Sequence, residues 1–415
     1  MNKIKKNKIA FFIGAFPAIS ESWFIEQLAG LIDMGAKIDI FSFKKGGKGN
    51  ISEKVQKYDL INKTTYLEYP NSWFKRISIG LYFFLKIILL KPSVIFNYYI
   101  YTRSNKQKFT LKYLFWIGPI VNKINNYYLI HCHFGMIGNR FLIIRKILKL
   151  KQKIVVTFYG QDSSKYIQQK GLRVYDNLKR ESSYFLLMTQ EMKERFVKLE
   201  FPVEKLLVHY TGVNMDNYIF NFKTFKRPNV FRIITVGRFV EKKGLEDALR
   251  AIKIAVKEYN NIELNIVGGG EKEYKDKLMK MVSEMGLEKN VKFLGLLPHQ
   301  ETISLFRKMH VMLQMSKRAK NGDTDDLPFV ILESQASGLP VITTRHVGIP
   351  DGICDKKTGY IVREGDYNEA SEKIMYLINN PELLQNFSYS AAKFVKNKFD
   401  LKKLNQKLIF LYKSL

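Results

Sequence analysis

The chain has 415 residues, of which 46% are hydrophobic and 13% aromatic, and it carries a formal net charge of +30. Enough apolar side chains are present for two cores, which excludes a disordered chain and favours two domains over one. Two cysteines, Cys132 and Cys354, are too few for a disulfide framework and favour a reducing compartment.

The positive charge is concentrated in the first half of the chain. Residues 1–228 contain 38 Lys and Arg against 15 Asp and Glu, whereas the remainder contains 30 against 23. Such a surface attracts polyanions, among them nucleic acid, anionic lipid head groups and acidic glycans. A generally high lysine content explains part of this excess but not its asymmetry. Charge alone does not specify nucleic acid, and no helix-turn-helix, RNP-type strand or zinc spacing accompanies it.

The first half predicts alternating strands and helices. Its opening residues are basic and then apolar, and they predict a buried strand at 8–16 (KIAFFIGAF) in preference to a signal peptide. An amphipathic helix is expected at 20–35, ended by Gly35, and a strand at 37–43. Further strands are expected at 127–134, 153–160 and 184–190.

Residues 77–101 (ISIGLYFFLKIILLKPSVIFNYYIY) form the most apolar segment. Lys86 and Lys91 interrupt it and Pro92 breaks it, so the uninterrupted part is too short to span a bilayer. Two alternatives stay open: a helix buried in the domain, or an interfacial helix flanked by basic side chains. With the cationic half around it, the segment favours peripheral attachment to an anionic membrane.

The alternation begins again at residue 231, after an aperiodic linker at 214–229. Strands are expected at 231–239, 262–270, 291–295, 311–316 and 340–344, and helices at 244–259, 273–286, 301–310 and within 325–338. Such alternation predicts parallel sheets with helices on both faces. We therefore expect an α/β protein with two Rossmann-like, doubly wound domains, 1–213 and 214–392, facing each other across a cleft. A last helix at about 393–415 is expected to pack back on the first domain.

Ligands of doubly wound sheets bind beyond the carboxyl ends of the strands. In TVGRFVEKKG, Gly237 ends a strand, and Arg238 and Lys243 lie beside the start of a helix. Two cations at a helix N-terminus favour a diphosphate, although a merely basic turn is the alternative. Gly14 follows the first strand, where a backbone without a side chain allows a ligand to approach closely.

The segment 325–351 (DDLPFVILESQASGLPVITTRHVGIPD) predicts a helix that begins near Pro328 and ends before Gly338. Asp326 is interpreted as a capping residue. Glu333 lies among apolar residues, where a carboxylate needs partners such as the two hydroxyls of a ribose. Eight helical residues rise about 12 Å, so Asp325 and Glu333 would contact opposite ends of an extended ligand. They are too far apart for the acid and base of a glycosidase, which lie about 5 to 9.5 Å apart.

These motifs, together with NIVGGGEKEY and VKFLGLLPHQETISLFRKMHVMLQMS, resemble the donor-binding domain of the retaining GT-B glycosyltransferases of glycosyltransferase family 4. The N-terminal pieces AFPAISESWFIEQLAGLIDMGAKIDIFSF, HCHFG, VVTFYGQD and VHYTGVN are similar to a branch that builds bacterial exopolysaccharides, capsules and lipopolysaccharide cores, including colanic-acid-type transferases. The resemblance covers nearly the whole chain. It implies transfer of a sugar from a nucleotide diphosphate sugar to a glycan or lipid-linked acceptor, with retention of configuration.

The resemblance also implies roles for individual residues. Arg238 and Lys243 would hold the donor diphosphate after Gly237 and stabilise the leaving group, as expected for catalysis by preorganised charge. Glu333 would bind the ribose, and Asp325 stands where the family has the first glutamate of its E-x7-E motif, near the sugar. The loop at Gly14 would close on the diphosphate, and the backbone at Gly295 and Leu296 would lie near the base. No metal and no cofactor besides the donor are expected.

Two departures from the family pattern bear on activity. Asp325 is one methylene shorter than the usual glutamate. Tyr159 in TFYGQD stands where many relatives have a histidine, and its phenol donates a hydrogen bond but carries no positive charge near neutral pH. His133 in HCHFG is the nearest other polar group, either a structural residue or a contact in the cleft. Asp323 and Asp325 resemble a metal-binding pair of another class, an interpretation that we reject because side-chain cations replace the ion in GT-B enzymes.

Three rival functions stay open. Tyr159 makes a catalytically impaired GT-B scaffold conceivable, and the net charge makes a nucleic-acid-binding protein conceivable. A GT-B epimerase or phosphorylase would share the architecture, but a pyridoxal-binding lysine context is not found. The favoured interpretation is a cytoplasmic glycosyltransferase, peripheral on the inner face of the cell membrane.

Overall fold

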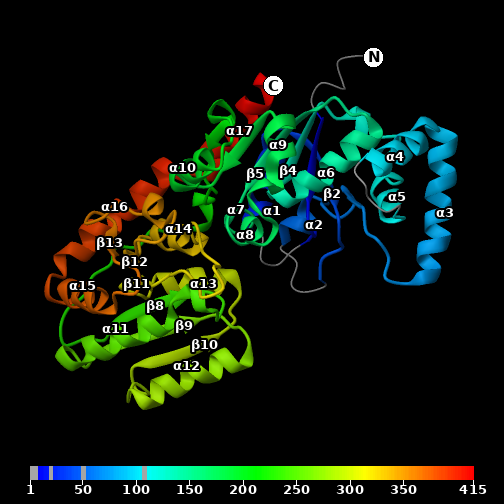
Figure 1. Ribbon diagram of the computed structural model, residues 1–415. Helices are drawn as coiled ribbons and strands as arrows, with labels where there is room; N and C mark the ends of the chain where they lie inside the picture. Colours follow the sequence, from blue (N-terminus) through cyan, green and yellow to red (C-terminus); the bar gives the residue numbers. More distant parts are fainter. Residues whose placement is uncertain (1–7, 18–21, 48–52, 105–109) are drawn as a thin grey trace.

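The computed structural model describes residues 8–17, 22–47, 53–104 and 110–415. Two sheets organise it, and each has helices on both of its faces (Figure 1). We call the part built on the first sheet the N-terminal unit and the part built on the second the C-terminal unit. The predicted start of the first helix at residues 20–21 and part of the loop after Gly14 lie outside the described residues.

The first sheet has seven parallel strands in the order β3-β2-β1-β4-β5-β6-β7. β1 is buried along nearly its whole length, as expected for a parallel strand covered on both faces. The strands are β3 (Thr64–Tyr66), β2 (Lys37–Ser42), β1 (Lys8–Ile13), β4 (Leu129–His133), β5 (Lys153–Phe158), β6 (Tyr184–Leu187) and β7 (Leu206–Val208).

Ten helices belong to the described part of this unit. They are α1 (Ser22–Asp33), α2 (Glu53–Lys57), α3 (Trp73–Leu90), α4 (Ser93–Ser104), α5 (Lys112–Ile117), α6 (Gly135–Leu148), α7 (Gly160–Ser163), α8 (Lys165–Lys170), α9 (Asp176–Glu181) and α10 (Gln190–Lys198). The apolar segment 77–101 thus forms two helices, α3 and α4, which meet at Pro92. They lie at the edge of the N-terminal unit that is remote from the C-terminal unit (Figure 1).

The second sheet has six parallel strands in the order β10-β9-β8-β11-β12-β13. They are β10 (Val291–Gly295), β9 (Ile262–Val267), β8 (Phe231–Val236), β11 (Val311–Gln314), β12 (Val341–Thr344) and β13 (Gly359–Val362). The helices of this unit are α11 (Leu245–Glu258), α12 (Lys272–Glu284), α13 (His299–Phe306), α14 (Phe329–Ala336), α15 (Tyr367–Asn379) and α16 (Glu382–Lys398). The two doubly wound α/β units confirm the predicted fold class.

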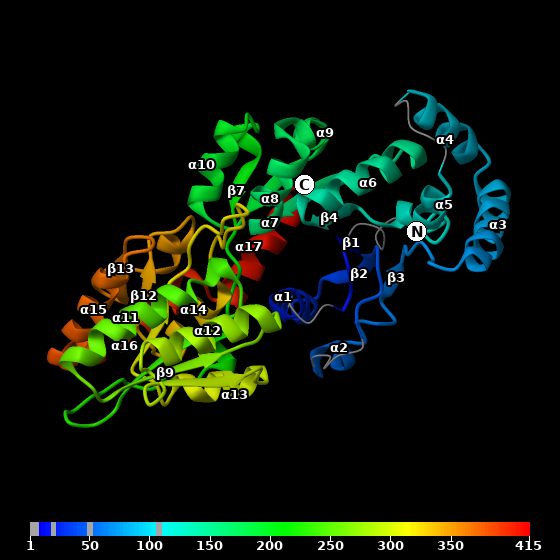
Figure 2. The same cartoon turned by 60° about the horizontal axis from the view of Figure 1, so that its bottom comes forward.

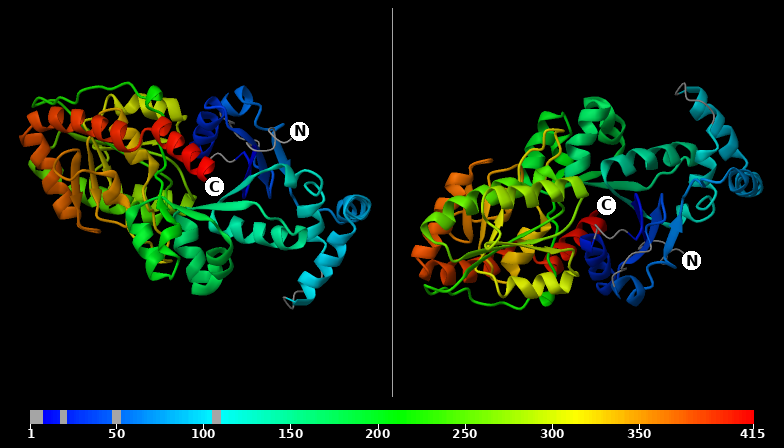
Figure 3. Two further views of the ribbon diagram at one scale, coloured as in Figure 1. Left: turned by 90° about the horizontal axis from the view of Figure 1, so that it is seen from above. Right: turned by 90° about the horizontal axis from the view of Figure 1, so that it is seen from below.

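The chain crosses between the units twice, and the second crossing ends in α17 (Leu401–Ser414), which packs on α1. Figures 2 and 3 show α16 and α17 running from the C-terminal unit to the first sheet. The backbone of Val213 bonds to that of Phe399 and Leu401, which holds the two crossings together. Tyr412 of α17 reaches the interior of the N-terminal unit, where its hydroxyl lies 2.6 Å from Nδ1 of His131.

Each predicted strand forms, and the three strands that the sequence did not reveal are β3, β7 and β13. Each has only three or four residues, too few to show a periodicity of two. All three lie toward the rims of their sheets, where neighbours cover less of a strand and a short length is tolerated.

One buried carboxylate fixes two neighbouring strand ends of the first sheet. Asp162 of α7 accepts hydrogen bonds from the backbone N–H of Gly135, where α6 begins, and from that of Tyr159 at 2.7 Å. The turns that follow β4 and β5 are thereby held in one arrangement. Burial raises the pKa of the Asp162 carboxyl to about 7, although these N–H donors favour the charged form.

Replacing Asp162 by asparagine is expected to change how stability depends on pH. The raised pKa means that between pH 3.8 and about 7 the folded chain binds a proton that the unfolded chain has lost. The free energy of unfolding contributed by this group therefore falls as the pH rises through that window, by at most about 1.4 kcal/mol per pH unit. Urea unfolding at several pH values should show this slope in the wild type but not in Asp162→Asn. Asp176→Asn, a change at a partly exposed carboxylate, is the control, and an unchanged slope in Asp162→Asn would contradict the assignment.

Candidate functional site

The strand order points to one edge of each sheet. Connections leave β1 and β4 in opposite directions in the first sheet, and β8 and β11 in opposite directions in the second. Ligands of doubly wound sheets bind at the carboxyl ends of such strand pairs. Gly14 follows β1 and His133 ends β4, while Gly237 and Arg238 follow β8. These four residues thus lie at the carboxyl ends of the two strand pairs.

The turn after β8 packs closely against the loop after β9 and carries the exposed Arg238. The N–H of Gly237 donates to the carbonyl of Val267 at 3.0 Å, and Gly268 has a φ of +140°. A Cβ on Gly268 would lie 1.9 Å from the carbonyl oxygen of Gly237, so only glycine allows these loops to touch. Arg238 follows with an exposed side chain, whose guanidinium has no hydrogen bond or ion pair with the rest of the described chain.

Lys243 reaches the same place from the start of α11. It ends a 3₁₀ turn, Glu241–Lys243, and its side chain lies over Gly237, where an added Cβ would be 3.2 Å from its Cδ. Gly244 follows with a φ of +63° against the carbonyl of Met315, a position that a side chain would block. Arg238 and Lys243 therefore belong to the turn that leads from β8 into α11, next to a helix N-terminus, which is an arrangement suited to an anion.

Asp325 lies against these cations. Its carboxylate is 2.6 Å from Nζ of Lys243 and 3.2 Å from Nζ of Lys242, and 14% of its side chain is exposed. Burial opposes ionisation of Asp325, but attraction to the two lysines outweighs burial and holds the pKa of this carboxyl below its ordinary value. Asp325 is therefore a carboxylate, and it offsets part of the positive charge at the site.

Asp323 also belongs to this cluster, at 3.2 Å from Nζ of Lys242. The Asp323 and Asp325 carboxylates therefore share an ammonium group. No group of three or more potential metal ligands occurs in the described ranges.

Two predictions about the segment before α14 are wrong. The helix begins only at Phe329, so Asp325 lies in the preceding loop and the helical rise does not give its separation from Glu333. Pro328 occupies the N-cap position, and Asp326 does not cap the helix. Its Oδ1 instead lies 2.9 Å from a guanidinium nitrogen of Arg195, on α10 of the N-terminal unit.

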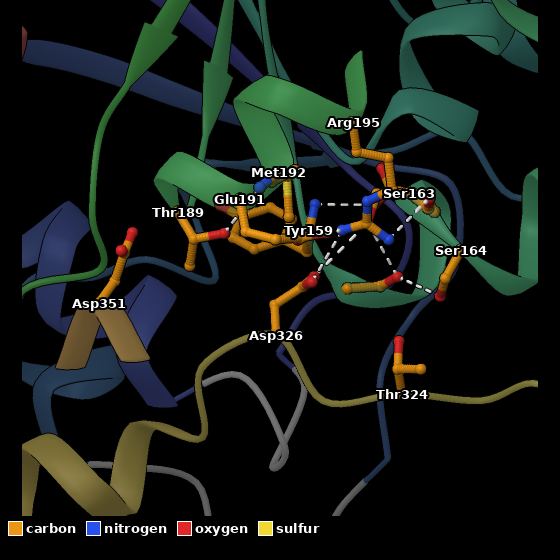
Figure 4. Close-up of polar contacts among 12 residues, drawn as sticks. Tyr159, Ser163, Ser164, Thr189, Glu191, Met192, Arg195, Thr324, Asp326 and Asp351 are labelled. Carbon is orange, nitrogen blue, oxygen red and sulfur yellow. Dashed lines mark hydrogen bonds and ion pairs between the residues drawn. The ribbon is translucent and has the colours of Figure 1, made fainter. Parts of the chain in front are cut away.

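Asp326 thus forms an ion pair between the two units. Figure 4 shows its carboxylate facing the guanidinium of Arg195, which also contacts the backbone oxygen of Ser163 at 3.3 Å. A Cβ on Gly160 would lie 2.9 Å from Oδ2 of Asp326, which explains the glycine in TFYGQD. Burial outweighs the attraction to Arg195 and raises the pKa of Asp326. Sequence reasoning missed this pair because its partners are 131 positions apart.

Glu333 lies on α14 and is almost completely buried. Its Oε1 accepts a hydrogen bond from the hydroxyl of Tyr218 at 2.8 Å and lies 2.5 Å from Nε2 of His299. The hydrogen bond to Glu333 raises the pKa of His299. No partner faces Oε2 from the part of the chain that the structure describes, which leaves this oxygen for a ligand. The sequence predicted that Glu333 needs partners, but it did not identify Tyr218 or His299.

Gly295 ends β10 and Leu296 follows it, beside the loop after β9. Gly295 has a φ of +73°, and its carbonyl accepts a hydrogen bond from the N–H of Gly268 at 2.8 Å. The exposed Leu296 side chain packs over Gly269, where an added Cβ would be 3.1 Å from its Cγ. An apolar, largely backbone surface therefore adjoins the loop that contacts Gly237.

His133 and Tyr159 form a pair at the carboxyl ends of β4 and β5. His133 is fully buried, and its Nδ1 lies 2.9 Å from the hydroxyl of Tyr159. Burial lowers the pKa of His133 to about 3, so the ring is neutral at physiological pH. Tyr159 is partly exposed and packs on Trp23, with ring centroids 4.5 Å apart. Of the two, Tyr159 is thus the one accessible to a ligand, with His133 behind it.

Comparison with known proteins shows what the chain is similar to. Residues 217–394 match the family "Glycosyl transferases group 1". The chain is 28% identical over 370 residues to the amylovoran biosynthesis glycosyltransferase AmsK of Erwinia amylovora, covering 86% of this chain and 88% of the relative. It is 26% identical over 413 residues to WcaL of Escherichia coli (strain K12), a protein assigned to colanic acid biosynthesis as a glycosyltransferase, covering 98% of this chain and all of the relative.

The same architecture occurs in a solved structure. HepE of Anabaena, crystallised with UDP and glucose, superposes with a TM-score of 0.73 over 99% of this chain and 100% of that chain, at 18% identity. This likeness shows the fold. The chain therefore has the GT-B fold, and its residues 217–394 match the model of the group 1 glycosyl transferases.

Proposed function

We propose that this protein is a retaining glycosyltransferase that transfers a sugar from a nucleotide diphosphate sugar to a glycan or lipid-linked acceptor. The observation that carries the proposal is that Lys243, paired with Asp325, and the exposed Arg238 both lie on the turn that leads from β8 to the N-terminus of α11. This arrangement suits a diphosphate flanked by a sugar. The order of motifs from Gly237 to Glu333 supports a family 4 enzyme and retention of configuration.

The geometry suggests how transfer would be assisted. As the bond between sugar and phosphate breaks, negative charge develops on the leaving nucleotide diphosphate. Arg238, exposed and without a carboxylate partner in the described chain, would take up this charge together with Lys243 and the N–H groups of α11. Such donors are already in place before the reaction, so they stabilise the transition state without reorganisation.

Asp325 would lie between the diphosphate site and the transferred sugar. Its carboxylate lies 2.6 Å from Nζ of Lys243, and the phosphates of a donor would compete for that ammonium group. The carboxylate would then be available to accept hydrogen bonds from sugar hydroxyls. Because Asp323 and Asp325 are both paired with lysine, side-chain cations take the place of a divalent ion in this proposal, and no cofactor besides the donor is required.

Separate elements would bind the ribose and the base and would cover the diphosphate. Oε2 of Glu333 would accept from the ribose hydroxyls, and the surface at Gly295 and Leu296 would lie beside the base. The loop at Gly14 would close over the diphosphate from the N-terminal unit. Tyr159, held by His133, would contact the sugar or the acceptor from the same side.

The pathway is proposed from the relatives. AmsK is named for amylovoran biosynthesis, WcaL for colanic acid, and CapM of Staphylococcus aureus, 27% identical over 220 residues, for capsular polysaccharide. We propose a role in bacterial surface polysaccharide biosynthesis. A cytoplasmic position at the inner face of the cell membrane suits this activity, because a water-soluble donor and a lipid-linked acceptor would meet there.

Removing either cation is expected to weaken nucleotide binding. Calorimetry with UDP, GDP and ADP should identify one diphosphate that binds, and Arg238→Ala or Lys243→Ala should weaken it about 10- to 100-fold, because a charged hydrogen bond contributes about 1.5–3 kcal/mol. Arg232→Ala, at the other end of β8, is the matched control. If Arg238→Ala binds as tightly as Arg232→Ala, or if no nucleotide binds at all, the proposed site is wrong. Loss of activity on adding EDTA, restored by manganese, would contradict metal-independent transfer.

Glu333 is expected to distinguish ribose from deoxyribose. The wild type should bind the ribonucleoside diphosphate more tightly than its 2′-deoxy analogue, since Oε2 accepts from the sugar hydroxyls. Glu333→Gln should bind the two ligands with about equal affinity, because an amide nitrogen facing the diol cannot accept a hydrogen bond from its hydroxyls. Arg238→Ala, which acts on the diphosphate, should keep the preference while weakening both ligands. A preference that survives in Glu333→Gln would place the ribose elsewhere.

Tyr159→Phe separates an active enzyme from a scaffold. If the hydroxyl contacts the reacting sugar, the variant should lose about 100-fold in kcat, as loss of a transition-state donor does, while its affinity for the nucleotide stays unchanged. Tyr166→Phe on the neighbouring α8 is the control. Rates are measured by release of nucleotide, and the anomeric configuration of the product by NMR. Wild-type protein that binds nucleotide but consumes no nucleotide sugar would favour the scaffold, and an inverted product would exclude retention.

A further inference from the structure

The helices α3 and α4 form an arm at the outer edge of the N-terminal unit. They lie on the far side of that unit from the C-terminal unit (Figures 1 and 2). Within the described ranges no single helix is long and apolar enough to cross a bilayer; α3 and α4 satisfy that requirement only as a pair, and the two axes are bent by 115°. The bend follows Leu90, where Lys91 and Pro92 separate the helices.

The helix α3 is apolar on two opposite faces. Its inner face packs on α5, where a Cβ on Gly80 would lie 3.6 Å from the ring of Phe115, and Phe83 and Phe115 lie 5.7 Å apart. Its outer face is also apolar but is in contact with solvent: Phe74 is 78% exposed and Leu89 is 82% exposed. The other exposed apolar residues of the arm are Trp73, Ile77, Leu81, Tyr82, Leu85, Ile88, Leu90, Phe96, Tyr99 and Ile100.

Such a face is costly in water. A helix that is apolar all round belongs in a protein core or against lipid, and apolar patches on a monomer of this size mark interaction sites. The exposed positions 74, 77, 81, 85 and 88 recur at intervals of three and four, which places them on one side of α3. The patch is therefore a stripe along α3, and Phe96 and Tyr99 add exposed aromatic side chains on α4.

The charge around the stripe has a single sign. Residues 69–161 contain 15 Lys and Arg and no Asp or Glu. On the arm itself, Lys75 and Arg103 are exposed, and Lys86 and Lys91 are partly exposed. An aromatic and aliphatic stripe with basic side chains beside it matches the composition of helices that lie in the head-group region of anionic bilayers.

We propose that the α3–α4 arm lies in the surface of an anionic bilayer, with the stripe from Phe74 to Leu89 inserted among the acyl chains and the lysines on the phosphates. The bend of 115° fits two helices lying along a surface. A second copy of the chain fits less well, because it would bring two acid-free, basic surfaces together. The inference does not rest on the donor chemistry, since it concerns the opposite end of the N-terminal unit.

Flotation with vesicles tests the arm without any measurement of activity. The full chain should float with vesicles of phosphatidylcholine and phosphatidylglycerol at low salt, and bind less to phosphatidylcholine alone. The double variant Phe74→Asp, Leu89→Asp should bind at least about tenfold more weakly, because two inserted apolar side chains are lost and two negative charges are added. Phe410→Asp, on α17, changes a phenylalanine that is 75% exposed and should float like the wild type.

A second variant keeps the proposal testable if the double variant does not fold. Lys75→Glu, Lys86→Glu changes only the charge and should lower binding to anionic vesicles while leaving the apolar stripe intact. The proposal is overturned if the wild type stays in the soluble fraction at low salt, or if both arm variants float as well as Phe410→Asp. A dimer in sedimentation that Leu89→Asp dissociates, without flotation of the wild type, would instead assign the stripe to a second copy.

Discussion

The arrangement of this molecule depends on two adjacent carboxylates that must each find a cation in a different unit. Asp325 is held by Lys243 and Lys242 of the C-terminal unit, and Asp326 by Arg195 of the N-terminal unit. An unpaired carboxylate in so buried a place is costly, and removing one partner of a buried pair costs about 3–5 kcal/mol. Consecutive residues of an irregular segment project in different directions, so one short loop serves both pairs. The donor-side cations and the neighbouring unit are thereby fixed relative to each other.

This constraint has a chemical consequence for the site. The charge of Lys243 is offset by Asp325, whereas Arg238 is exposed and without a carboxylate partner in the described chain. An arriving diphosphate would meet Arg238 first and then draw Lys243 from Asp325. Binding and release of the carboxylate are then coupled, because both anions compete for one ammonium group. The Asp325 carboxylate lies within 3.2 Å of both lysine ammonium groups, which suits such an exchange.

Much of the fold was predictable because its signals are local. A buried parallel strand such as β1 is a nearly continuous apolar run followed by glycine, and Gly237 and Gly244 mark the turn that carries Arg238. The rest depends on contacts between distant residues. Nothing near Asp326 in the sequence indicates Arg195, and the resulting interpretation of Asp326 as a cap was wrong. Glu333 was expected to need partners, but Tyr218 and His299 lie on other elements. The short strands β3, β7 and β13 carry too few residues for a periodic signal.

The net charge of +30 includes two sets of basic residues, one at the proposed donor site and one in residues 69–161. At the proposed donor site the lysines are matched by carboxylates, so the site is selective for a ligand that competes with Asp325 and does not attract every anion. Among the basic residues of 69–161, Arg145 and Lys146 face Glu181, whereas those on the α3–α4 arm form no ion pair within the described residues. A surface that only needs to attract a sheet of anionic head groups requires no such matching, since a bilayer presents many equivalent phosphates. If both proposals hold, the asymmetry between the halves of the chain follows from their ligands: one diphosphate for the C-terminal unit, and an extended anionic surface for the N-terminal unit.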